Sequence, residues 1–179
     1  TAVLTVLEGA QAHELDTRVA WRKVVKAGNK DFSLVYDGMW GMVAASDAGC
    51  ARYQEVVATI QPEPRAQVTR DPAELYAHAA AVRQTYAALL ARLPVSDVEV
   101  NVPPSLKQMG RIVEKSVLKR VDDPGNADRV CDVVRGMVLC DNMSQIASVA
   151  EWLRDDDQIV VTRVKDRFFD CPSDGGWRD

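Results

Sequence analysis

The stretch that decides the fold is residues 130–164, which reads VCDVVRGMVLCDNMSQIASVAEWLRDDDQIVVTRV. Its first part, residues 130–140, is apolar apart from Asp132 and Arg135, which predicts a strand. Residues 143–154 carry apolar side chains at helical spacing, and residues 158–164 predict a second strand. This order predicts a β-α-β unit, although two strands by themselves do not decide whether the pairing is parallel.

The chain that precedes this unit has a helix-rich pattern. Its clearest helix begins with Asp71 as the cap and Pro72 at the first helical position, and its apolar period continues to Pro94. Further helices are expected over 10–30, 46–60 and 105–120. The secondary structure of the apolar segment over 32–45 stays undecided, because two glycines interrupt its pattern. The predicted fold class is therefore α/β (α+β), a helix-rich N-terminal part followed by a β-α-β unit.

A proline-bearing polar segment, residues 61–64, is the predicted boundary between two regions of the chain. It separates an N-terminal helical region over 1–66, whose role the sequence does not indicate, from a second region over 71–179.

Composition excludes several classes of protein. The 179 residues carry a net charge of −4 with a pI of about 5.2, which argues against general nucleic-acid binding. There is no apolar run of the length of a transmembrane segment. The four cysteines show no zinc-ligand spacing, so free thiols in a reducing intracellular compartment, cytoplasmic or organellar, are expected.

The helix expected over 105–120 has a basic face. Its basic side chains recur every four residues opposite an apolar face, and they are Lys107, Arg111, Lys115 and Lys119. Such a band could hold a polyphosphate through charge-assisted hydrogen bonds. The same pattern is also that of an ordinary amphipathic surface helix.

Asp132 is the second candidate, because an unpaired carboxylate is costly to bury inside an apolar strand. A magnesium ion or lysines from the preceding helix would compensate it, and strand alternation places Arg135 on the other face. A solvated strand edge is the alternative. Near the end of the chain, Trp177 follows a pair of glycines in a loop where a nucleotide base could stack, or the ring could belong to the core.

In order, these pieces resemble the opening of the RelA/SpoT family's nucleotidyltransferase domain, in a divergent eukaryotic form. The resemblance covers roughly residues 75–179. It rests on four pieces, which are the basic helix with Lys107, Arg111 and Lys115, the Asp132-Val133-Val134-Arg135-Gly136 segment, the Arg163-Val164-Lys165-Asp166-Arg167-Phe168 segment, and the final Gly175-Gly176-Trp177-Arg178-Asp179 loop.

The resemblance implies that the basic residues contact the phosphates of ATP, that Asp132 binds Mg²⁺, and that Trp177 stacks on the guanine of GDP or GTP. The family reaction is pyrophosphoryl transfer to the 3′-hydroxyl of the acceptor. This chain departs from the family at Arg135, where the arginine falls on a different register, and at Trp177, where the family has tyrosine. The family's later catalytic glutamate would lie beyond Asp179.

Two interpretations follow. The first is a degenerate or truncated domain that binds a purine nucleotide but is not catalytically complete, unless further chain supplies the glutamate and restores a pyrophosphoryl transferase. The second is a non-catalytic subunit that binds other protein chains in a larger assembly, for which the apolar segment around Met39 and Trp40 is the expected interface.

Overall fold

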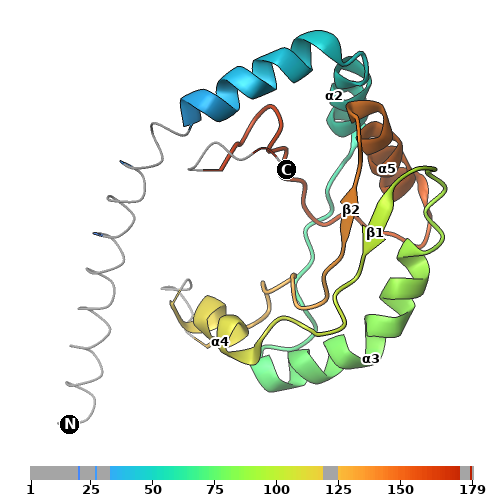
Figure 1. Cartoon of the computed structure of the whole chain (residues 1–179). Coiled ribbons are helices and arrows are strands. Elements are labelled where there is room, and N and C mark those ends of the chain that lie inside the picture. Colours follow the sequence, from blue (N-terminus) through green and yellow to red (C-terminus); the bar gives the residue numbers. More distant parts are fainter. Residues whose placement is uncertain (1–19, 21–26, 28–32, 119–124, 174–177, 179) are drawn as a thin grey trace. The chain divides into compact units, whose positions relative to one another are not determined.

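The structure is a computed structural model of mixed α/β, helix-rich architecture (Figure 1). It describes residues 20, 27, 33–118, 125–173 and 178. Contacts divide the chain into two compact units, residues 47–164 and residues 1–46 with 165–179. No helix in the described ranges is long and apolar enough to cross a membrane.

Two helices of the 47–164 unit, α2 (Gly49–Thr59) and α5 (Met143–Asp155), lie side by side (Figure 1). Asp47 ties their N-terminal ends together, because its Oδ1 accepts from the Gly49 amide and its Oδ2 from the Met143 amide, both at 2.8 Å. These carboxylate contacts satisfy amides that a helix leaves without an internal partner. The helix predicted over 143–154 is confirmed.

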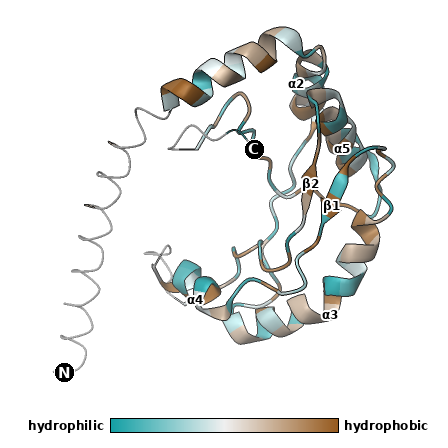
Figure 2. Ribbon diagram, viewed as in Figure 1, coloured by the Kyte–Doolittle hydropathy of each residue, from teal (hydrophilic) through white to brown (hydrophobic). Residues whose placement is uncertain are grey.

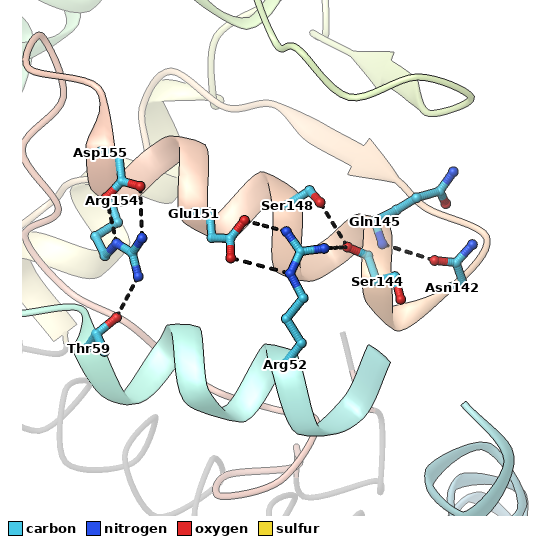
Figure 3. A network of polar contacts seen from close by, with 9 residues as sticks. All are labelled: Arg52, Thr59, Asn142, Ser144, Gln145, Ser148, Glu151, Arg154 and Asp155. Atoms are coloured by element: carbon cyan, nitrogen blue, oxygen red, sulfur yellow. Dashed lines mark hydrogen bonds and ion pairs between the residues drawn. The ribbon is translucent and has the colours of Figure 1, made fainter. Parts of the chain in front are cut away.

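The α2–α5 contact is close at its start and polar along its exposed side. A Cβ atom on Gly49 would lie only 2.2 Å from the backbone nitrogen of Ser144, so the contact requires glycine there. Figure 3 shows the polar side, where Arg52 pairs with Glu151 and Arg154 donates to the Thr59 hydroxyl at 2.7 Å.

Helix α3 (Pro72–Leu90) begins as predicted, with the Asp71 carboxylate accepting from the Ala73 amide at 2.7 Å. It packs against α4 (Met109–Leu118). The core between these helices and the loop that follows them contains Leu75, Ala79, Ile112, Ala127, Val130 and Val133. This core holds in place the loop in which Asp132 lies.

The strands differ from the prediction. The described sheet pairs β1 (Glu99–Asn101) with β2 (Met137–Leu139) in antiparallel register, with Val100 opposite Val138. Figure 2 shows that β2 is apolar along its length, whereas β1 is mostly polar. The sheet therefore includes three residues of the predicted 130–140 strand and three residues, Glu99–Asn101, for which no strand was predicted.

The predicted strand over 158–164 is wrong, and with it the β-α-β unit. Within the described part of the chain, residues 158–164 form no strand, and their one backbone hydrogen bond beyond their own turn runs from the Glu63 amide to the Val161 carbonyl. The first part of the other predicted strand is a loop, because Val130 and Val133 are buried among the helices instead of pairing with a neighbouring strand. β-Branched composition favours extended backbone but supplies no partner.

The helix predicted over 105–120 begins later, at Met109. Residues 106 and 107 are occupied by tertiary contacts, since Leu106 packs on the core and the Lys107 amide donates to the Val133 carbonyl at 3.0 Å.

In the other unit, residues 33–46 are helical, which resolves the undecided segment. Trp40 contacts the rings of Phe168 and Phe169, with centroids 5.5 and 5.1 Å away. The guanidinium of Arg178 lies over the same indole and pairs with Asp37 at 2.8 Å. The helix predicted over 10–30 lies outside the described residues except for positions 20 and 27, both of which are helical.

Candidate functional site

Asp132 lies in the loop between α4 and β2, not on a strand. The loop turns at residue 130, whose amide donates to the Ala127 carbonyl at 2.9 Å. Val130 and Val133 are 5% and 4% exposed, so the residues on both sides of the carboxylate are anchored in the core. The position of Asp132 is therefore set by apolar packing on both sides of it.

Lys107 reaches Asp132 from the segment before α4. Its backbone is held by the hydrogen bond to Val133, and its Nζ lies 2.5 Å from the Oδ2 of Asp132. The Lys107 side chain is only 10% exposed, which is uncommon for lysine unless the charge is paired.

Lys115 reaches the same carboxylate oxygen from α4. Ile112, fully buried one turn earlier, anchors this part of the helix. The Lys115 Nζ lies 2.6 Å from the Oδ2 of Asp132, and its side chain is 32% exposed. The prediction that lysines from the preceding helix compensate Asp132 is confirmed for Lys115, whereas Lys107 pairs with Asp132 from the segment before that helix.

The electrostatics follow from these contacts. Burial raises the pKa of Asp132, but the hydrogen bonds and positive charges of Lys107 and Lys115 outweigh it and hold the pKa at about 2. Burial lowers the pKa of Lys107, with Asp132 opposing the effect and Lys115 adding to it. Two ammonium groups around one carboxylate leave the cluster, Lys107, Lys115 and Asp132, with a surplus positive charge.

The other carboxylate oxygen of Asp132 has different surroundings from Oδ2. Its Oδ1 is buried and accepts no hydrogen bond from the part of the chain that the structure describes. A buried acceptor without a partner costs about 1–3 kcal/mol. The two oxygens are thus unequal, one shared by two lysines and one enclosed.

The remaining predicted site residues are not brought to this cluster. Arg111 forms an ion pair with Glu114, and its side chain is 65% exposed. The spacing of three between these two residues is a known helical pairing and is visible in the sequence, so it could have indicated this alternative. Lys119 and Trp177 lie outside the described residues.

The donor set does not fit a magnesium ion bound directly to Asp132. Magnesium requires near-octahedral oxygen coordination at about 2.0–2.1 Å. The accessible oxygen of Asp132 is taken by two ammonium groups and the other oxygen is buried. Within the described ranges, no group of three or more acidic, histidine or cysteine side chains could hold a metal ion.

Comparisons with protein-family models, with curated protein sequences and with solved structures find no match to this chain. The RelA/SpoT resemblance therefore rests on the quoted residues and stays a prediction.

Proposed function

We propose that this chain binds the phosphate groups of a purine nucleotide at Lys107 and Lys115, without catalysing phosphoryl or pyrophosphoryl transfer. The observation that carries the proposal is the convergence of both ammonium groups on one oxygen of Asp132, at 2.5 and 2.6 Å. Holding two like charges together costs free energy, and an anionic ligand would relieve that cost.

The ammonium groups have donors to offer such a ligand. Each carries three N–H bonds, and one from each is directed to Asp132. The others are suited to phosphate oxygens, with which charged donors form short hydrogen bonds. Lys115 is the more exposed of the two and would make the first contact.

The purine part of the proposal comes from the resemblance, in which Trp177 would stack on the base. Arg111 and Lys119 remain proposed phosphate contacts on the same ground, and Arg111 would have to leave Glu114 to take part. Absence of catalysis is proposed because the carboxylate to which the resemblance assigns the metal ion, Asp132, has its accessible oxygen held by two ammonium groups.

Thermal unfolding with and without ATP or GDP tests the proposal. A ligand at 100 times its Kd stabilises the fold by about 2.7 kcal/mol. At this chain length that corresponds to a rise in Tm of roughly 5–10 °C. Lys115→Met should remove most of the rise, whereas Arg65→Met, a matched change at a surface arginine paired with Glu63, should leave it intact. Absence of any rise with both nucleotides for the wild-type chain would refute the proposal.

A second function, a non-catalytic subunit of a protein assembly, is favoured by a separate observation. The helix over 33–46 exposes large apolar side chains, among them Leu34 at 72% and Met42 at 68%. Exposed apolar groups gathered on one element often mark an interface. Met42→Asp should release bound protein chains from the affinity-purified protein and leave nucleotide binding unchanged. Unaltered co-purification would count against this interface.

A further inference from the structure

We infer that the Lys115 ammonium occupies the place on Asp132 that a divalent cation would otherwise take, so that the cluster binds phosphate without a metal ion. The phosphate part rests on the proposed function. The part that concerns the cation rests only on the contacts of Asp132 and can be tested by itself.

The geometry of the carboxylate carries the inference. Its Oδ2 is 2.5 Å from one ammonium group and 2.6 Å from the other, so a cation placed there would meet two positive groups at contact distance. Its Oδ1 is buried, which removes the second approach. A divalent cation could bind only after a lysine had left.

The lysines are held where they are by the fold. The Lys107 side chain is almost enclosed, and its backbone is hydrogen-bonded to Val133. Lys115 is carried by a helix turn that includes Ile112 and Ser116, both fully buried. The fold thus brings the two ammonium groups together on Asp132 without the help of a ligand.

Charge then predicts an unusual preference between forms of the nucleotide. Free ATP carries more negative charge than its magnesium complex, and the cluster already contains its own cations. Free ATP should therefore bind more tightly than magnesium-ATP, whereas a site built on a metal-binding carboxylate shows the opposite order.

The first experiment measures ATP affinity by calorimetry in EDTA and in excess magnesium. We expect a several-fold lower Kd in EDTA, and for Asp132→Asn a Kd equal to or lower than that of wild type, because a negative charge beside the phosphate is removed. A requirement for magnesium, or loss of ATP binding in Asp132→Asn, would overturn the inference while leaving nucleotide binding itself established.

The second experiment uses Mn²⁺ alone and needs no nucleotide. Millimolar Mn²⁺ should leave the Tm of wild type unchanged and raise that of Lys115→Glu, in which a second carboxylate replaces the ammonium beside Asp132. The rise should vanish in the double variant Lys115→Glu, Asp132→Asn. If Lys115→Glu does not fold, Lys115→Gln, which frees Asp132 without adding a charge, should still show weak Mn²⁺ binding by paramagnetic relaxation.

The outcomes separate the two proposals. If ATP fails to bind in either buffer, the proposed function fails, and the Mn²⁺ titration still judges the role of Lys115. If Mn²⁺ binds wild type and Asp132→Asn abolishes that binding, Lys115 does not exclude the cation and the inference is wrong.

Discussion

The charge on Asp132 should stabilise the fold in a way that depends on pH. Asparagine is close in shape to a protonated aspartic acid, so Asp132→Asn removes the negative charge and keeps an oxygen for the lysines. The folded-state pKa of Asp132 is about 2, below the ordinary value of 3.8. Because the folded pKa is depressed, the stabilisation is present above the unfolded value and is lost as the pH falls toward 2.

The magnitude follows from the same values. A change from 3.8 to about 2 corresponds to roughly 2.5 kcal/mol if it is fully expressed. The Asp132 side chain is 38% exposed, so solvent screens the pairing, and we expect about 1 kcal/mol to remain. That lowers the Tm of Asp132→Asn by roughly 2–4 °C at neutral pH.

Urea unfolding of wild type and Asp132→Asn between pH 7 and pH 2.5 measures the effect. The difference in unfolding free energy should be constant from neutral pH down to about pH 5 and should shrink between pH 4 and the lowest value. Asp157→Asn, at an exposed turn residue after α5, serves as the matched control and should show little difference throughout. A difference between wild type and Asp132→Asn that stays constant down to the lowest pH would refute the reasoning.

Two paired substitutions test the packing that supports the site. Gly49→Ala would place a Cβ 2.2 Å from the Ser144 amide nitrogen and should destabilise the fold by about 1–3 kcal/mol. Gly110→Ala, at a helical glycine with open space around it, should stabilise the fold by up to about 1 kcal/mol. Denaturant titration of both variants measures the two effects, and effects of the same sign would contradict this reasoning. Ile112→Ala should lower the unfolding free energy by about 2–5 kcal/mol because the side chain is fully buried. Val113→Ala, at a side chain that is 42% exposed on the same helix, should lower it far less. Equal decreases in Tm for the two variants would contradict the assigned core.

The elements that the sequence predicted well have local causes. Helix α3 has its cap and first-position proline at Asp71 and Pro72, and α5 has an apolar face of helical period within 13 residues. The need for a positive charge beside Asp132 was also predictable, since a carboxylate among apolar residues must be compensated.

The strands were predicted poorly because a strand depends on its neighbour. Residues 158–164 have the composition of a strand but pair with no strand among the described residues, while the more polar Glu99–Asn101 forms a strand by pairing with Met137–Leu139. The prediction that Lys107 lies on the same helix as the other basic residues was wrong for the same reason. Lys107 was placed on the helix by its spacing, yet its backbone is engaged by Val133, 26 positions away in the chain.

By itself, then, the sequence determined the mixed, helix-rich class, the beginnings of its strongest helices and the need for a cation beside Asp132. Only the tertiary structure decided that this cation is a pair of lysines sharing one oxygen, that the other oxygen is enclosed, and that Arg111 is engaged by Glu114. The first set depends on residues within a few positions of one another. The second depends on how a loop, a helix and an extended segment pack together, which no local pattern specifies.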